Sequence, residues 1–178
     1  MTSDFGYNYY NHCGPTAITN IIKMYGKKYN NNIIKNNSAE DVFLTVMGSN
    51  INYKYYNPTD GTWNSSADSY IRDSFKMYNI TVRTYGEYNN RAPYKINYQN
   101  TVNAFATSNR LMYIMTTRND TRHPYTFHHL VGYGYTRIAN NSGVYRAFIK
   151  VCDGLANRAR YVEIDSIADG GTYWEVYF

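Results

Sequence analysis

The chain has 178 residues, of which 43% are hydrophobic and 17% charged, a balance that excludes a disordered protein and fits one globular domain over residues 1–178. Its net charge is +5, but the lysines and arginines are scattered, which argues against a nucleic-acid-binding surface. Two cysteines are too few for a disulfide framework or a cysteine-based zinc site, and no apolar run approaches the 18 residues typical of a membrane-spanning helix.

The first half of the chain is predicted to be helical. Apolar residues at helical spacing predict a helix over 14–25, and Gly26 is expected to end it as a C′ residue. Ser38 and Asp41 have the spacing of a capping box, which predicts the start of a second helix. The other predicted helical boundaries are Gly48 for the end of the second helix, 64–79 for a third and roughly 99–108 for a fourth.

The second half changes to short segments rich in β-branched and aromatic residues, separated by turn residues. Because helices come first and strands do not alternate with helices, the sequence predicts an α+β fold with an antiparallel sheet. The predicted strands cover 79–85, 110–117, 127–136, 143–153, 159–165 and 172–178.

Cys13 stands directly before Gly-Pro-Thr-Ala, at the expected start of the first helix. Pro15 suits a first helical turn, where its missing N–H would have no partner in any case. The free N–H groups and the positive end of the helix dipole would lower the pKa of the Cys13 thiol into the reactive range. A free cysteine is also often a small buried hydrophobe. The Gly-Pro-Thr-Ala context favours the nucleophile.

A thiol nucleophile needs a base and a group that orients the base. His12 adjoins Cys13 but should point elsewhere, and His123 lies in a polar turn. His128 and His129 open the apolar strand HHLVGYGY, and strand alternation sends their side chains to opposite faces, so one of the two can be the base. Asp153 ends the next strand and would accept the second imidazole N–H.

The order of these features resembles the papain-like cysteine peptidases, and within them the bacterial branch that includes the bacteriocin-processing, double-glycine-leader peptidases. The resemblance rests on the helix-opening CGPTA, on the six positions from His128 to Gly134 in HHLVGYGY, and on a strand that ends in Asp153. It covers about 16 residues near the start and about 30 near the end, and the segment from about 27 to 110 carries no matching motif. It implies a helical half whose central helix begins with the catalytic cysteine, and a half built on an antiparallel sheet.

The resemblance implies a hydrolase that cleaves peptide bonds through a thioester acyl-enzyme, with Cys13 as nucleophile, His128 as base and Asp153 as the group that orients His128. Alternation would place His128 on the face of Gly132, turned toward Cys13. His129 is the alternative base if the strand register differs by one residue.

The family glutamine that completes the oxyanion hole lies six residues before the cysteine, and that position is Tyr7 in this chain. Asn8 is therefore expected to supply the side-chain donor, together with the main-chain N–H of Cys13. Asn11 is a second amide nearby, although it lies very close to the cysteine. Both asparagines could instead be turn residues.

The expected partner is a peptide or protein substrate, with no metal, cofactor, nucleic acid or membrane involved, and the protein is expected to be a monomer. Secretion after removal of an N-terminal segment is an expectation that follows from the resemblance. Two alternatives stay open at this point. One is an acyl or peptidyl transferase on the same scaffold, and the other is a catalytically silent peptide-binding module.

Overall fold

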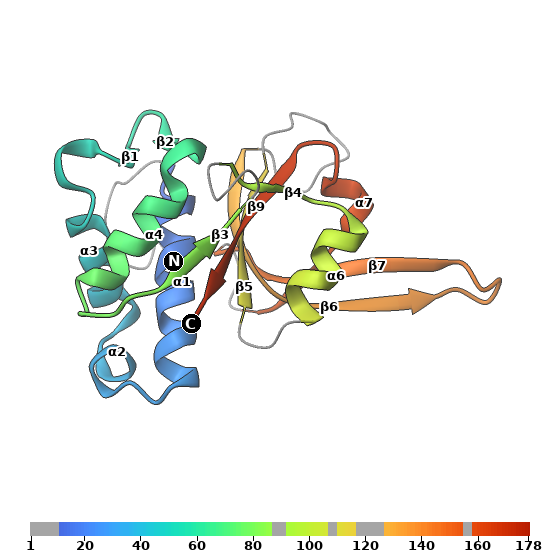
Figure 1. The fold of residues 1–178 in the computed structure, drawn as a ribbon, viewed down its shortest axis with the longest axis horizontal. Coiled ribbons are helices and arrows are strands. Elements are labelled where there is room, and N and C mark those ends of the chain that lie inside the picture. The colour runs from blue at the N-terminus through green and yellow to red at the C-terminus, as the bar shows by residue number, and fades with distance from the viewer. Residues whose placement is uncertain (1–10, 87–91, 107–109, 117–126, 155–157) are drawn as a thin grey trace.

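The computed structural model describes residues 11–86, 92–106, 110–116, 127–154 and 158–178. A helical half and a sheet half lie side by side, and α1 stands at the boundary between them (Figure 1). The coarse prediction of an α+β fold, with helices first and an antiparallel sheet later, is confirmed.

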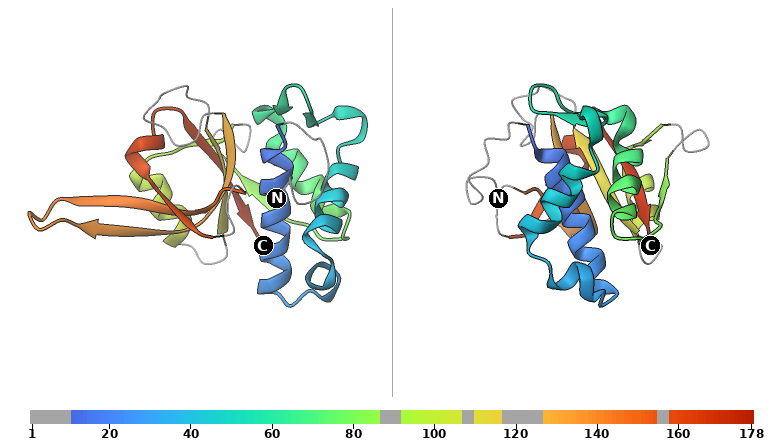
Figure 2. Two further views of the ribbon diagram at one scale, coloured as in Figure 1. Left: turned by 180° about the vertical axis from the view of Figure 1, so that it is seen from behind. Right: turned by 90° about the vertical axis from the view of Figure 1, so that its left-hand side faces the viewer.

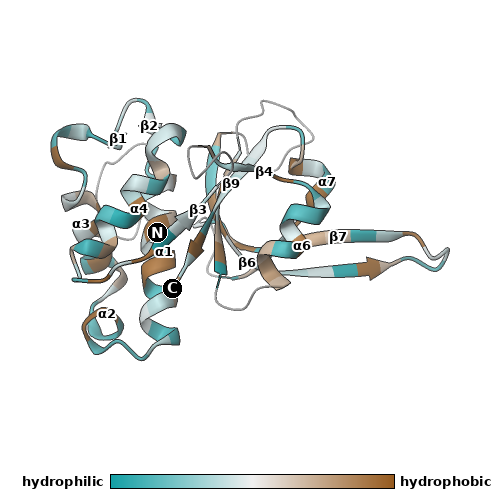
Figure 3. Ribbon diagram, in the orientation of Figure 1, coloured by the Kyte–Doolittle hydropathy of each residue, from teal (hydrophilic) through white to brown (hydrophobic). Residues whose placement is uncertain are grey.

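The helical half is organised around α1, which contacts the three other helices of this half and also the sheet strands β5 and β6. Its side chains at helical spacing explain this position, because Ile18, Ile21 and Ile22 are completely buried. Hydrophobic residues gather in the middle of α1 in Figure 3. The helices of this half are α1 (Cys13–Lys28), α2 (Asn32–Asn36), α3 (Ala39–Gly48) and α4 (Ala67–Lys76).

Two predictions about helix ends had different outcomes. The capping box at Ser38 and Asp41 is confirmed, with both of its hydrogen bonds present. The prediction that Gly26 ends the first helix is wrong, since α1 continues to Lys28. Gly26 instead allows close packing, because a Cβ at this position would lie 2.4 Å from Cγ2 of Ile34 in α2.

A small hairpin between α3 and α4 was not predicted. It consists of β1 (Tyr56–Asn57) and β2 (Gly61–Thr62), with the 3₁₀ turns η1 (Ile51–Tyr53) before it and η2 (Asn64–Ser66) after it. Asn50 fixes the hairpin, because its amide donates to the carbonyl of Tyr56 at 2.6 Å and its side-chain oxygen accepts from the N–H of Tyr55 at 2.7 Å.

The main sheet has the strand order β3-β9-β5-β6-β7-β8, with β4 also paired to β9, and every pairing is antiparallel. Its strands are β3 (Arg83–Tyr85), β4 (Tyr94–Lys95), β5 (Arg110–Thr116), β6 (His128–Ala139), β7 (Tyr145–Cys152), β8 (Arg160–Glu163) and β9 (Gly171–Tyr177).

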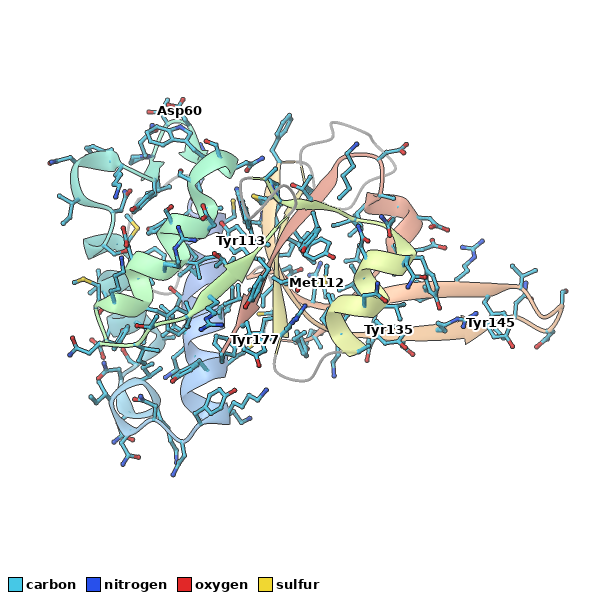
Figure 4. The ribbon with its side chains drawn as sticks, viewed as in Figure 1. Asp60, Met112, Tyr113, Tyr135, Tyr145 and Tyr177 are labelled. Atoms are coloured by element: carbon cyan, nitrogen blue, oxygen red, sulfur yellow. The ribbon has the colours of Figure 1, made fainter. Side chains whose placement is uncertain are left out.

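The two faces of the sheet belong to two different cores. Tyr113 and Val131 pack in the core shared with α1, whereas Met112 and Leu130 pack in a second core. Figure 4 shows the neighbours Tyr113 and Met112 on opposite sides of the sheet. The helices α6 (Tyr98–Ala106) and α7 (Ile164–Ile167) lie on the side away from α1 (Figure 1).

Strands β6 and β7 continue beyond the rest of the sheet as a long arm (Figure 1 and the left view of Figure 2). The register of β6 on β7 shifts between Gly132 and Gly134, so a bulge separates the buried start of β6 from the exposed arm. The arm carries exposed apolar side chains, including Ile138 and Tyr145. Only the first five residues of β6, before the bulge, lie in the main body of the sheet.

Candidate active site

Cys13 is the first residue of α1, at a helix end that carries no side-chain cap and no acidic residue in its first turn. Its sulfur lies against the main-chain N–H groups of Cys13, Gly14 and His129, each of which favours the thiolate. The contact with the His129 N–H places the thiol beside the peptide bond that joins His128 and His129, and the thiol also lies 3.9 Å from the carbonyl oxygen of Asn11. The helix start thus brings Cys13 to the start of β6.

Burial acts against the thiolate. It is the largest influence on Cys13, and it raises the pKa of the thiol above its ordinary value despite the three N–H groups. The N–H groups of the helix end do lower the pKa of Cys13, but burial raises it by more, so the expectation of a lowered pKa is wrong. A thiol of this kind needs a base that removes its proton during the reaction.

Asn11 has a structural task just before Cys13. It has a left-handed backbone with φ of 56°, and its side-chain amide donates to the carbonyls of Thr59 at 2.9 Å and Pro58 at 3.2 Å. These bonds tie the segment before the nucleophile to the hairpin loop. Because both amide hydrogens are used, Asn11 is not available for an oxyanion hole. Asn8, the predicted donor, lies outside the described residues.

The glycine of CGPTA is explained by the hairpin. A Cβ on Gly14 would lie 1.9 Å from Oγ1 and 2.5 Å from Cβ of Thr62, distances that side-chain atoms cannot adopt. Strand β2 therefore passes directly over the first turn of α1. Thr62 becomes a neighbour of Cys13 only because residue 14 has no side chain.

His128 is held at both its main chain and its ring. The hydroxyl of Thr116 accepts from the N–H of His128 at 3.0 Å and contacts its carbonyl at 3.1 Å. The ring Nε2 lies 2.9 Å from the main-chain carbonyl of Asp153. A carbonyl can only accept, so Nε2 carries the proton and Nδ1 is the basic nitrogen. Thr116 was not predicted to have a role in positioning His128.

Asp153 contacts His128 in a different way from the one predicted. The expected bond to the imidazole runs to the main-chain oxygen of Asp153. The carboxylate, whose side chain is fully buried, accepts instead from Nε of Arg160 at 3.1 Å. Burial lowers the pKa of His128, while the carbonyl and the charge of Asp153 raise it. Asp153 therefore orients the ring by its backbone and favours the imidazolium by its charge.

The strand alternation of the two histidines is as predicted, but the expectation that the face of His128 and Gly132 turns toward Cys13 is wrong. The side chain that lines the cavity with Cys13 is that of His129, which lies on the α1 face with Val131. The space at Gly132 is already filled, since a Cβ there would lie 3.0 Å from Ile114 and 3.1 Å from Ile149. His128 is not among the described residues that line the cavity, and its ring lies beside the main-chain carbonyl of Asp153.

A cavity of ≈ 490 Å³ opens beside Cys13. One wall comes from the helical half, through the segment 60–65 that includes β2 and the beginning of η2, and the other comes from the end of β5 and the beginning of β6. Its described lining residues are Asn11, Cys13, Asp60, Gly61, Thr62, Trp63, Asn64, Ser65, Thr116, Phe127 and His129.

Cys152, the other cysteine, is free and partly buried, and it packs against the core that contains α1. Burial raises the pKa of its thiol. No three His, Cys, Asp or Glu side chains within the described ranges gather in a way that could hold a metal ion. In the same ranges, no helix combines the length and the apolar character needed to cross a bilayer.

Comparisons with known proteins leave the site to be judged on its geometry. No family model, curated protein or solved structure matches this chain.

Proposed function

We propose that this protein is a cysteine peptidase of papain-like type, with Cys13 as nucleophile and His128 as base. The observation that carries the proposal is the meeting of the uncapped start of α1 with the start of β6. There the Cys13 sulfur lies against the His129 N–H, and the ring of His128, the preceding residue in the chain, is fixed by the carbonyl of Asp153. The cavity beside the thiol supplies room for a peptide.

The reaction begins with proton transfer from the Cys13 thiol to Nδ1 of His128 while the sulfur attacks a peptide carbonyl. The N–H of Cys13, at the positive end of α1, stabilises the oxyanion, and Asn8 is proposed as the second donor. The imidazolium returns its proton to the leaving amine, which breaks the C–N bond and leaves a thioester. Water, deprotonated by the same nitrogen, then releases the acid and restores the thiol.

The charges around His128 fit this sequence of steps. The imidazolium exists only between the two proton transfers, and the buried carboxylate of Asp153 favours it at that stage. Burial raises the pKa of the Cys13 thiol, so the proposed reaction needs His128 to remove the thiol proton.

A peptide library tests the proposal, with Cys13→Ala as the blank. We expect cleavage that disappears in the blank, and a wild-type mass increase that matches the acyl group when the reaction is stopped with acid. Cleavage that persists in Cys13→Ala would contradict the proposal.

The library also separates the two alternatives when an amine is added. Transfer of the acyl group to the amine in preference to water would identify a transferase. Peptide binding without any acyl-enzyme would identify a silent binding module.

A further inference from the structure

The cavity beside Cys13 has a single acidic side chain among its described lining residues, that of Asp60. Asp60 is exposed and lies in the loop between β1 and β2 (Figures 1 and 4). It forms no ion pair with any residue that the structure describes. Five other described acids do have a lysine or arginine partner: Asp68, Asp73, Asp153, Glu163 and Glu175. An accessible carboxylate at a cavity wall can bind the cation of a ligand.

The main chain on both sides of Asp60 lies against Asn11, two residues before Cys13. The carbonyl of Thr59 accepts from the Asn11 amide at 2.9 Å, and a Cβ on Gly61 would lie 3.4 Å from Cβ of Asn11. The loop that carries the Asp60 carboxylate is therefore fastened to the segment that leads into the proposed nucleophile. A substrate bound at Cys13 passes close to this loop.

Asn57 orients the Asp60 carboxylate and leaves its charge in place. The side-chain oxygen of Asn57 accepts from the N–H of Asp60 at 2.7 Å, and the Asn57 amide donates to Oδ2 of Asp60 at 2.8 Å. Because Asn57 is neutral, these bonds do not compensate the negative charge. No described residue donates to Oδ1 of Asp60, so this oxygen can accept from a ligand.

Two exposed aromatic side chains line the same cavity. Trp63, which follows β2 on the helical wall, is 40% exposed, and Phe127, which precedes β6 on the sheet wall, is 65% exposed. Phe127 has a φ of 46°, a left-handed conformation that large side chains rarely adopt. Residues held in such conformations cluster at binding sites. Each wall of the cavity therefore offers an accessible ring to a ligand.

We propose that this cavity binds the side chain of an arginine or lysine of the substrate. Asp60 pairs with the charged end of that side chain, and Trp63 and Phe127 contact its aliphatic stem. The inference rests on the proposed function, because it treats the cavity as part of the peptide site. Long basic side chains combine an apolar stem with a cationic end, and their cations are also attracted to aromatic faces.

Other substrate side chains match these three residues less well. An aliphatic or aromatic side chain could contact the rings, but it would leave the charge of Asp60 without a partner. A carboxylate would be repelled by Asp60. A short polar side chain would present little apolar surface to the rings. The cavity volume of ≈ 490 Å³ leaves room for a long side chain.

The first experiment measures kcat/KM on peptides with acetylated amino termini, so that one side chain is the only cation varied. Arginine is compared with citrulline, which has nearly the same shape and no charge, and lysine with norleucine, at three positions on each side of the scissile bond. At one position we expect the cation to be preferred about tenfold. In 1 M NaCl this preference should fall to about twofold, because the Asp60 carboxylate is exposed to the salt.

Variants assign the preference to Asp60. Asp60→Asn should bring the ratio of arginine to citrulline close to one. Asp165→Asn is the matched control, because Asp165 is also exposed and its replacement changes the net charge equally. It lies on α7, on the side of the sheet away from α1, so the ratio should be kept (Figure 1). Trp63→Leu should reduce the preference for citrulline over alanine about threefold, because it removes contact with the stem.

The second experiment does not depend on turnover. N-acetyl-arginine methylamide and N-acetyl-citrulline methylamide are titrated into the Cys13→Ala protein, and tryptophan fluorescence reports binding. Trp174 is 2% exposed, so the change should come from Trp63, and Trp63→Phe should remove it. We expect the arginine compound to bind about tenfold tighter, and Asp60→Asn to abolish the difference.

The outcomes separate the two proposals. Charge-selective binding that requires Asp60, without any Cys13-dependent cleavage, would overturn the peptidase and keep the cation site. Cys13-dependent cleavage with both ratios near one at every position would overturn the cation site and keep the peptidase. The same holds if Asp165→Asn lowers the ratio as much as Asp60→Asn does. If Asp60→Asn does not fold, the wild-type ratios at low and high salt decide.

Discussion

Two helices of the helical half begin in opposite ways. At the start of α3, the Ser38 hydroxyl accepts from the N–H of Asp41 and the Asp41 carboxylate accepts from the N–H of Ser38, both at 3.0 Å. At the start of α1, His12 offers no side-chain cap and no acid lies in the first turn. The start of α3 is capped by its own side chains, whereas no side chain caps the start of α1.

The same two ends show how burial decides the charge that a helix end can hold. Asp41 is exposed, and the Ser38 bonds lower the pKa of its carboxyl. Cys13 is partly buried, and desolvation raises the pKa of its thiol although three main-chain N–H groups act in the opposite direction. Hydrogen bonds therefore lower the pKa at the exposed end of α3, whereas desolvation outweighs them at the partly buried end of α1.

Cys13→Ala, at the uncapped start of α1, should have the largest effect on activity. We expect turnover to fall at least about a thousandfold with almost unchanged stability, because the change removes the attacking atom and little packing. The measurement is kcat/KM on the best library peptide, with urea unfolding as the check on folding. Cys152→Ala is the matched control and should keep its activity, whereas a comparable loss there would contradict the assignment.

His128→Ala tests whether Cys13, at the uncapped start of α1, needs the proposed base on β6. Loss of the base should lower kcat about a hundred- to ten-thousandfold. Asp153→Asn should cost less, because the main-chain carbonyl that holds Nε2 remains. A larger loss in Asp153→Asn than in His128→Ala, in folded proteins, would show that the ring is oriented by the carboxylate.

His129 should make the protein sensitive to acid. Its folded pKa of about 3 lies below the ordinary 6.5, so the stabilisation is complete above pH 6.5 and is lost as the pH falls toward 3. Between pH 7 and pH 4 the loss should be about 3 kcal/mol. Urea unfolding at both values measures it. His129→Gln, which stays polar but does not titrate, should lose less stability over this interval, and an unchanged loss would contradict the burial of a neutral ring.

Gly14→Ala should disturb the open end without touching a reacting group. The added Cβ would collide with Thr62, and overpacking of this kind costs about 1–3 kcal/mol. Thermal unfolding gives the loss, and kcat/KM should fall with it because the cavity wall moves. The double change Gly14→Ala with Thr62→Gly should be less destabilised than the sum of the single changes, and simple additivity would show that the two residues do not meet.

Ser38→Ala should have the smallest effect on activity, and it measures how much the capped start of α3 contributes to stability. Removal of a capping hydroxyl costs about 1 kcal/mol of stability. Activity should stay within about twofold of wild type, because α3 does not reach the cavity. A clear loss of kcat would mean that the two helix ends are coupled.

Some helix ends could be predicted from the sequence and others could not. The capping box was readable because both of its partners lie within four residues. The end of α1 was not readable, because the role of Gly26 depends on Ile34 in the next helix. The hairpin of β1 and β2 was missed, since its two-residue strands are fixed by Asn50 and carry no periodic pattern.

At the site, the residue types were predictable and their contacts were not. The positions of Cys13 at a helix start and of His128 at a strand start follow from local patterns. The strand faces depended on an empty space at Gly132, which Ile114 and Ile149 from neighbouring strands fill. Thr116 and Arg160, which hold His128 and Asp153, lie on other strands, so no local motif reveals them.

The bonds from Asn11 to the loop at 58–59 have a consequence for the timing of activity. They span 47 and 48 residues, whereas α1 itself needs only neighbouring ones. A chain emerging from the ribosome can form α1 early, yet His128, Asp153 and Arg160 are synthesised long after Cys13. If the proposed function holds, a nascent or partly folded chain is inert toward its own peptide bonds. The recovery of activity on refolding would then report the formation of contacts between residues far apart in the sequence, and not the formation of α1.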